Sequence, residues 1–186
     1  MGIMFLDPRQ FPFLADLRAD WQAIREECLA LADDIYEPWV QREMYSHGWS
    51  VYGLVAFGTR IEEALAACPR TAAALATVPH LTTAGFSRMA PGSHIAPHEG
   101  WVTTVYRAHL GLVVPGEGAL RVGDEIRRWR EGEIFVFDDT VEHEAWNHAE
   151  SDRTVLLFDF SRPGHENAPQ DRLPPSVQEH LRRRDR

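Results

Sequence analysis

The sequence contains little cysteine, with Cys28 and Cys68 as the only two thiols among 186 residues. Neither belongs to a CxxC pair or to a Cys/His pattern with the spacing of a zinc site. Two isolated cysteines of this kind are typical of reduced core thiols in a reducing compartment. Zinc-finger and thiol-redox functions are therefore disfavoured, and a cytoplasmic location is expected.

Long apolar runs and a basic N-terminal segment are also missing. The first eight residues lack the charged start and the extended apolar stretch of a secretory signal. No uncharged stretch approaches the roughly 20 residues that cross a bilayer, so no membrane partner is expected. The formal net charge of −9 argues against a nucleic-acid partner, and the arginine-rich residues 181–186 are interpreted as a short basic helix in a solvated tail.

The first half of the chain shows helical patterns around one strand. Residues 49–57 predict a strand, and residues 61–67 and 71–76 predict two short alanine-rich helices separated by Pro69. Before them, apolar residues recur at steps of three and four and predict one helix that packs on a sheet. This apolar stripe comprises Leu14, Leu17, Trp21, Ile24, Cys28 and Leu31.

From residue 81 to residue 160 the pattern changes to short β-like runs separated by turn residues. Many short strands at this spacing indicate a sandwich or barrel. We expect a mainly β fold with flanking helices (α+β), in the form of a double-stranded β-helix of the jelly-roll or cupin-like type. One domain is expected, with residues 1–80 as support, 81–161 as the barrel core and 162–186 as a C-terminal tail.

Two histidines lie where such a barrel presents metal ligands. His98 follows Pro97 near the start of a strand, and His143 follows a run, residues 132–142, that looks like the second half of a cupin signature. Imidazole binds iron, manganese, nickel, copper or zinc, so the histidines alone do not select the metal.

The usual third ligand of an iron oxygenase is missing from its expected position. A carboxylate commonly lies two residues after the first histidine, because alternate strand residues share a face. Gly100 occupies that position, and the adjacent Glu99 is expected to point the other way. The sequence therefore predicts a two-histidine site without a carboxylate, which binds bare metal weakly and depends more on a chelating 2-oxoacid.

Three basic side chains predict an anion pocket near these histidines. Arg153 lies in an otherwise apolar strand, where a charged side chain needs an opposite charge. Arg107 and His109 alternate along another strand and so share a face. Arginine binds carboxylates bidentately, which favours a dicarboxylate cosubstrate. The alternative is structural pairing of the arginines with Asp138, Asp139 or Asp159.

These residues are specific enough to indicate a family. Residues 87–160 resemble the aspartyl/asparaginyl β-hydroxylase family of Fe(II)/2-oxoglutarate oxygenases, and the resemblance weakens towards Trp49. The matching pieces are residues 91–94, 97–100, 107–112 and 137–144, together with Arg153. The resemblance implies that His98 and His143 bind iron. It also implies that 2-oxoglutarate is held by Trp49, Ser87, Arg107, His109 and Arg153.

The resemblance further implies a reaction. With molecular oxygen, 2-oxoglutarate would give succinate and CO2 while an unactivated C–H bond of an amino-acid-type substrate is hydroxylated. The substrate would be a free amino acid, a carrier-tethered one or a peptide aspartyl or asparaginyl residue; acyl chains of lipids are less expected. Two alternatives stay open: a halogenase, because Gly100 leaves room for chloride on iron, and a non-oxidative cupin-type isomerase or sensor.

Overall fold

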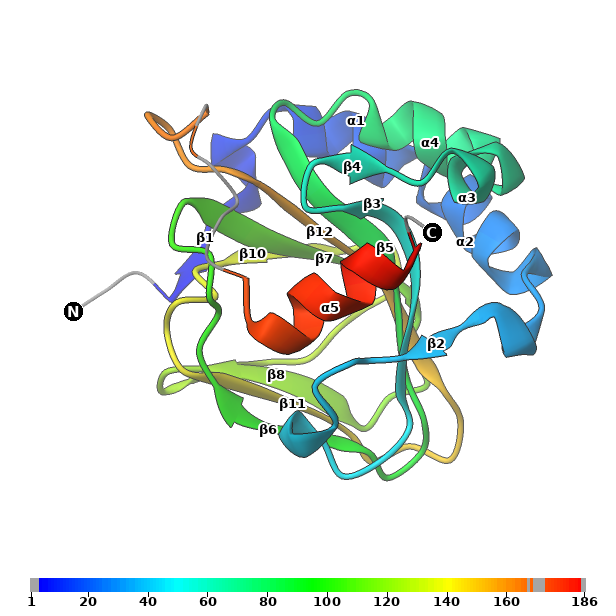
Figure 1. The fold of residues 1–186 in the computed structure, drawn as a ribbon. Helices are drawn as coiled ribbons and strands as arrows, with labels where there is room; N and C mark the ends of the chain where they lie inside the picture. Colours follow the sequence, from blue (N-terminus) through cyan, green and yellow to red (C-terminus); the bar gives the residue numbers. More distant parts are fainter. Residues whose placement is uncertain (1–3, 167, 169–172, 185–186) are drawn as a thin grey trace.

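The structure, a computed structural model, describes residues 4–166, 168 and 173–184, and it contains two β-sheets that face each other (Figure 1). The larger sheet has eight strands in the order β1-β10-β7-β12-β5-β3-β2, and β4 pairs with β3. The pairings between these strands are antiparallel. Its strands are β1 (Phe5–Leu6), β2 (Glu37–Pro38), β3 (Trp49–Ala56), β4 (Thr59–Arg60), β5 (Leu81–Met89), β7 (Val105–Val113), β10 (Ile134–Phe137) and β12 (Arg153–Ser161).

The smaller sheet has four antiparallel strands in the order β6-β11-β8-β9. These strands are β6 (His94–His98), β8 (Gly118–Val122), β9 (Glu125–Arg127) and β11 (His143–Asn147). The two sheets do not close into a continuous barrel. They confirm the predicted fold class, a cupin-like jelly roll of mainly β structure with flanking helices.

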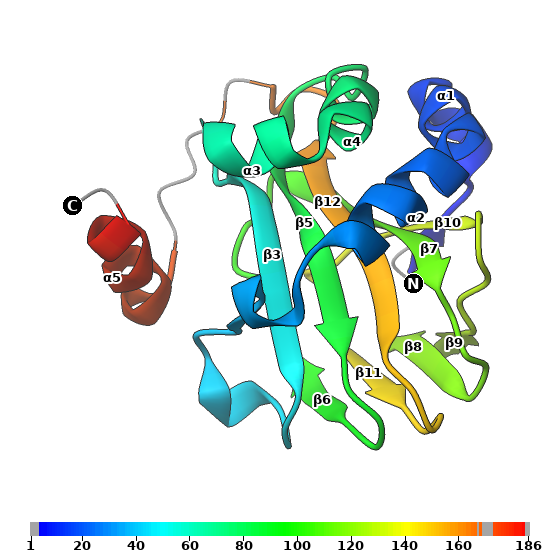
Figure 2. The same ribbon diagram turned by 90° about the vertical axis from the view of Figure 1, so that its right-hand side faces the viewer.

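Helices cover the outer face of the larger sheet, as Figures 1 and 2 show. Their apolar residues, among them Leu17 and Ile24, form one core cluster with Phe86, Leu156 and Phe158 of the sheet. The helices are α1 (Phe13–Ala19), α2 (Trp21–Ala30), α3 (Glu62–Ala67) and α4 (Pro69–Leu75), and short 3-10 turns span Pro8–Gln10, Asp33–Ile35 and Arg42–Met44.

The single helix predicted over residues 14–31 is wrong in one respect, because the chain forms α1 and α2 with a break at Asp20. Asp20 has φ −91° and ψ 7°, outside the helical region, and its N–H bonds to the carbonyl of Arg18 instead of continuing the regular helix. The apolar stripe survives the break, since Leu17 and Ile24 are both buried in the same cluster.

A second apolar cluster fills the space between the sheets. It contains Trp49, Met89, Trp129, Phe137 and Val155. The inner faces of the sheets therefore meet in a packed interior, and the predicted site residues lie along this interior.

The C-terminal region contains a helix, α5 (Pro175–Arg184), at the open end of the space between the sheets (Figures 1 and 2). The predicted short basic helix is present as part of α5, and Arg182 and Arg183 are exposed as expected. The helix is not wholly solvated, however, because Val177 is only 2% exposed. The predicted tail also includes residues 167, 169–172, 185 and 186, which lie outside the described residues.

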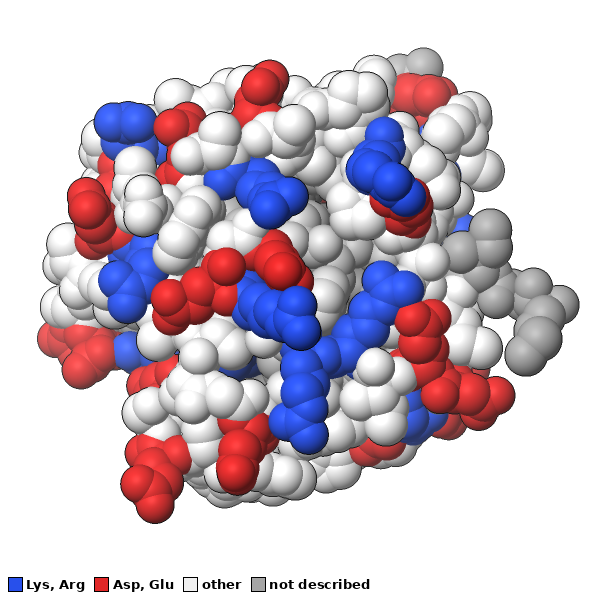
Figure 3. All heavy atoms as spheres, turned by 180° about the vertical axis from the view of Figure 1, so that it is seen from behind, with Lys and Arg blue, Asp and Glu red and all other residues white. Residues whose placement is uncertain are grey.

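No helix in the described part of the chain is both long and apolar enough to cross a membrane. The chain has no lysine, so its basic surface is made by arginine alone. In Figure 3 the arginines on the rear face are interspersed with acidic side chains. Several basic side chains lie next to one another near the centre of this face, with acidic side chains around them.

Candidate active site

His98 and His143 lie side by side although they are far apart in the sequence. His98 ends β6 and His143 begins β11, and the antiparallel register pairs these two residues directly. Their ring centroids are 4.2 Å apart. The smaller sheet therefore presents both imidazoles at one end of two neighbouring strands, as the sequence predicts, although His98 lies at the end of its strand and not near its start.

Both imidazoles are held in the orientation and the charge state that bind a metal. Nδ1 of His98 lies 2.8 Å from the carbonyl of Ala96, and Nδ1 of His143 lies 2.9 Å from that of Val141. A carbonyl only accepts, so each Nδ1 carries the proton and each Nε2 keeps a free lone pair. Burial lowers the pKa of His98, and burial together with His98 lowers the pKa of His143 to about 3, so both rings are neutral at neutral pH.

A buried carboxylate fills the space beside Gly100. A Cβ added to Gly100 would lie 2.2 Å from Oδ2 of Asp139, and Asp139 is 1% exposed. Glu99 lies beyond the end of β6 and is exposed. Among the described residues, no group of three or more His, Cys, Asp or Glu side chains could hold a metal ion. The two-histidine site without a carboxylate ligand stays a prediction.

Arg107 is already paired with two carboxylates. Its Nε and Nη2 donate to Asp159 at 2.8 Å each, and its Nη1 lies 3.2 Å from Oδ2 of Asp139. Burial acts to lower the pKa of Arg107, but Asp159 and Asp139 outweigh it and raise the pKa above its usual value. Burial also raises the pKa of Asp139 to about 6, against the effect of Arg107. The structural-pairing alternative is thus realised for Arg107, and its contact with 2-oxoglutarate stays a prediction.

Arg153, by contrast, is a buried cation without an acidic partner among the described residues. It is 2% exposed, its Nη1 donates to the carbonyl of Ser87 at 3.3 Å, and its Nε has no hydrogen-bond partner. Its guanidinium lies over the ring of Trp129, 4.4 Å from the centroid. Burial lowers the pKa of Arg153 to about 9, so the group still carries its charge at neutral pH. An unpaired buried charge is costly, and an anionic ligand would relieve that cost.

His109 adds a second buried donor without a partner, and it also contacts Trp129. Nε1 of Trp129 donates to Nδ1 of His109 at 3.3 Å, so the proton of neutral His109 is on Nε2. Nε2 of His109 is buried and has no partner. Burial and the nearby Arg153 hold the pKa of His109 well below its usual value. His109 and Arg153 together offer N–H groups suited to carboxylate oxygens. The sequence analysis did not predict Trp129 as a site residue, because nothing in its sequence neighbourhood distinguishes it.

The remaining predicted residues include a buried hydrogen-bonded pair that helps to line a cavity. Nε1 of Trp49 donates to Oγ of Ser87 at 3.1 Å, and both residues are buried. Trp49, Ser87, His98 and Arg107 line a cavity of ≈ 140 Å³ that also reaches Asp139. The structure thus gathers the predicted residues along one interior space, although His109, His143 and Arg153 are not part of the cavity lining.

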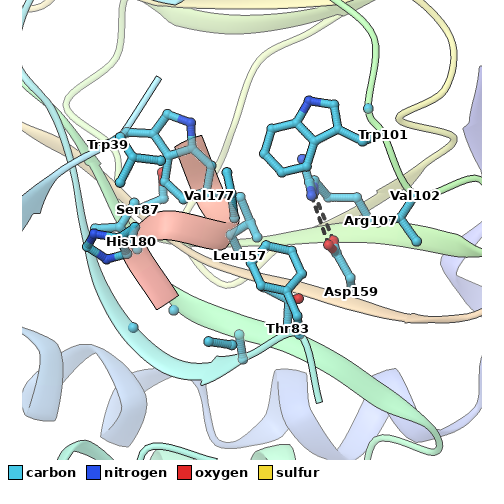
Figure 4. Close-up of a pocket in the computed structure, with 18 of the residues that line it drawn as sticks. Trp39, Thr83, Ser87, Trp101, Val102, Arg107, Leu157, Asp159, Val177 and His180 are labelled. Atoms are coloured by element: carbon cyan, nitrogen blue, oxygen red, sulfur yellow. Dashed lines mark hydrogen bonds and ion pairs between the residues drawn. The ribbon is translucent and has the colours of Figure 1, made fainter. Parts of the chain in front are cut away.

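Sequence reasoning missed a second part of the cavity wall. Trp39 from the segment after β2 and Val177 from α5 both line the cavity (Figure 4). Trp39 packs against Trp49 at 5.1 Å and against Trp101 at 6.2 Å between ring centroids. A signal was available for α5, since Val177 and Leu181 are four residues apart and share a helix face.

Known proteins resemble this chain over most of its length. A family model described as Aspartyl/Asparaginyl beta-hydroxylase matches residues 18–163. The ornithine lipid ester-linked acyl 2-hydroxylase of Rhizobium tropici is 39% identical over 169 residues, which cover 84% of this chain and 60% of that protein. The aspartyl/asparaginyl beta-hydroxylase of Homo sapiens is 36% identical over 165 residues, which cover 84% of this chain and 22% of that protein.

The chain therefore spans less than two thirds of the length of both relatives. Among solved structures, a prolyl-4-hydroxylase from Pseudomonas putida aligns with a TM-score of 0.49 and 20% identity, over 80% of this chain and 87% of that one. The match to the family model covers the strands that carry the histidine pair and the buried arginine. The chain belongs to the aspartyl/asparaginyl β-hydroxylase family.

Proposed function

We propose that this chain is an Fe(II)- and 2-oxoglutarate-dependent hydroxylase. The observation that carries the proposal is Arg153, a buried guanidinium without a carboxylate partner, in the same interior as the neutral pair His98 and His143. A neutral imidazole pair suits a divalent metal, and an unpaired guanidinium suits the distal carboxylate of a dicarboxylate. Family membership supports the hydroxylase role.

The chain's own residues would position the reactants. Nε2 of His98 and Nε2 of His143 would hold the iron, while Arg153 and Nε2 of His109 would bind one carboxylate of 2-oxoglutarate. Trp49 would keep Ser87 in place through its hydrogen bond. When bound, iron and 2-oxoglutarate supply the oxidation, in which 2-oxoglutarate and O2 yield succinate and CO2 and one oxygen atom enters a C–H bond. The buried interior would exclude water from this chemistry.

The names of the two relatives offer two substrate classes for this chain. One is an aspartyl or asparaginyl residue, in line with the amino-acid-type substrate that the resemblance implies, and the other is an ester-linked acyl chain. Hydroxylation is favoured over halogenation, because the Asp139 carboxylate lies in the space beside Gly100 where chloride would otherwise have room. We place the activity in the cytoplasm, in keeping with two buried, free cysteines.

The proposed function predicts binding and slow turnover of 2-oxoglutarate by the purified protein. Under anaerobic conditions 2-oxoglutarate should bind tightly with Fe(II) or Zn(II) present and only weakly without metal, because the metal and Arg153 hold opposite ends of the ligand. After oxygen is admitted, only the Fe(II) sample should release succinate, since Zn(II) has no redox chemistry. Mass spectrometry of succinate and calorimetry of binding provide the readouts.

An outcome with neither binding nor succinate release would contradict the proposal and favour a non-oxidative sensor or isomerase. A chlorinated product, formed in the presence of chloride without a hydroxylated one, would favour the halogenase instead.

A further inference from the structure

We propose that the group bound for hydroxylation is an apolar acyl chain, held in the cavity between the larger sheet and α5, rather than an aspartyl or asparaginyl side chain. This inference rests on the proposed function and specifies its substrate class. Its basis is the composition of the cavity wall, the pairing of the charged groups in it, and the position of α5.

The cavity extends from His98 across the larger sheet. In the strand register, Arg107 of β7 is paired with Asp159 of β12, and Asp159 is paired with Thr83 of β5. The next strand is β3, whose Val55 pairs with Ala84 of β5. Three strand spacings of about 4.8 Å give a length of roughly 14 Å from β7 to β3. The cavity is therefore elongated, and its far end is remote from the predicted metal ligands.

The far part of the cavity is lined mainly by hydrocarbon. Glycine is paired with glycine where Gly53 of β3 meets Gly85 of β5, so no side chain rises from the floor at that point. The surrounding apolar lining includes Trp39, Val51, Ala56, Phe57, Leu157 and Leu181. An unbranched hydrocarbon chain buries its surface favourably in such a lining, at about 25 cal/mol per Å².

The charged groups of the lining do not suit an aspartyl carboxylate. Arg107 is bound by Asp139 and Asp159, and His180 lies 3.3 Å from a carboxylate oxygen of Glu37. Asp139 and Asp159 would repel a further carboxylate in the same space. A substrate carboxylate would enter this cavity without a free cationic partner among the described lining residues, which is strongly unfavourable.

The unpaired polar atoms of the lining match a carbonyl group instead. Oγ1 of Thr83 and Nε1 of Trp39 are buried and have no hydrogen-bond partner. Each can donate to an oxygen, and one or two donors satisfy an ester or amide carbonyl. A carboxamide side chain would bring two further N–H donors, for which the described lining offers one buried carboxylate oxygen without a partner, Oδ1 of Asp139.

Helix α5 forms the outer wall of this channel. Val177 is 2% exposed and lines the cavity with His180 and Leu181, and Figure 4 shows Val177 and His180 on the opposite side from the Arg107–Asp159 pair. The neighbouring Gln178 of α5 is exposed. The helix thus turns apolar side chains towards the channel and polar ones towards solvent, as expected for a cover over a hydrocarbon chain.

The test combines direct binding with product analysis on the full chain. A fluorescent fatty-acid methyl ester, which carries no carboxylate, should bind the metal-free protein and be displaced by acyl esters of increasing chain length. Acyl probes, supplied as esters in detergent, as phospholipid vesicles or on an acyl carrier protein, should raise succinate release by about tenfold or more over the rate without substrate. One of them should gain one oxygen atom by mass spectrometry, and the most active form identifies the source of the chain.

Two variants report on the channel, each with a matched control. Ala56→Trp should fill the far end and shift the preferred acyl chain to a shorter length, whereas Ile126→Trp, at a position 57% exposed and outside the cavity lining, should not. Val177→Asp should weaken binding of the fluorescent chain by at least tenfold, whereas Gln178→Asp should leave it unchanged. Melting curves confirm that each variant is folded.

Stimulation by aspartyl or asparaginyl peptides with none by acyl chains would overturn the inference. If 2-oxoglutarate binds and yields succinate while no acyl probe binds or reacts, the inference falls and the proposed function stands. If 2-oxoglutarate itself does not bind with metal present, the proposed function falls, and the inference falls with it.

Discussion

Replacement of Arg153 by methionine is expected to abolish tight binding of 2-oxoglutarate while making the metal-free protein more stable. Arg153 is buried and lacks a carboxylate partner, so its charge is unfavourable until an anion binds. Removing one partner of a buried, hydrogen-bonded charge pair costs about 2–5 kcal/mol, which corresponds to a loss of affinity of about 30-fold or more. Replacing buried ionic groups by apolar ones of similar volume often stabilises a protein by about 1–4 kcal/mol.

The opposite signs of the two effects make the result diagnostic. Calorimetry with Zn(II) in place of iron measures the affinity for 2-oxoglutarate, and urea unfolding measures stability. Arg130→Met is the matched control, because the Arg130 side chain is 76% exposed, and neither quantity should change. An Arg153→Met protein that keeps its affinity for 2-oxoglutarate, or that is strongly destabilised, would show that Arg153 is a structural residue.

Replacement of either His98 or His143 by alanine should remove the metal site. Loss of a group that only orients a metal ligand typically costs 10–100-fold in metal affinity, so loss of one of two protein ligands should cost more than about 100-fold. The binding of 2-oxoglutarate should weaken in parallel, because the cosubstrate is held in part by the metal. Competition with a chromophoric chelator measures the affinity for the metal.

His148→Ala serves as the control for these variants, since His148 is an exposed histidine directly after β11, the strand that begins with His143. It should bind metal as the unmodified protein does. Full metal affinity in either His98→Ala or His143→Ala would exclude that histidine as a ligand and would remove the two-histidine interpretation.

Local patterns in the sequence account for most of the fold. The strand predicted over residues 49–57 is β3, and the two short helices predicted around Pro69 are α3 and α4. Turn residues divide the second half into strands, so the jelly-roll class follows from the sequence. The break at Asp20 does not, because the apolar periodicity continues through it and only the backbone angles reveal the interruption.

The sequence indicates that the two histidines lie together, but it does not indicate how the charged residues pair. A motif indicates that His98 and His143 are presented together, and the structure confirms their proximity. Three aspartates were possible partners for the arginines, and the sequence could not decide among them. Which arginine pairs with which aspartate depends on strand register. The register pairs Arg107 with Asp159 and leaves Arg153 beside Ser87. Such long-range pairings follow from tertiary structure and have no local signature.

The central claim is that two histidines without a carboxylate hold iron beside a 2-oxoglutarate bound by Arg153. Anomalous diffraction at the iron edge, from crystals grown anaerobically with Fe(II) and 2-oxoglutarate, tests it most directly. The account predicts one iron peak between Nε2 of His98 and Nε2 of His143, with a carboxylate of the bound 2-oxoglutarate on Arg153. Iron coordinated by Asp139 or Glu99, or an Arg153 that contacts no ligand while 2-oxoglutarate binds elsewhere, would contradict it.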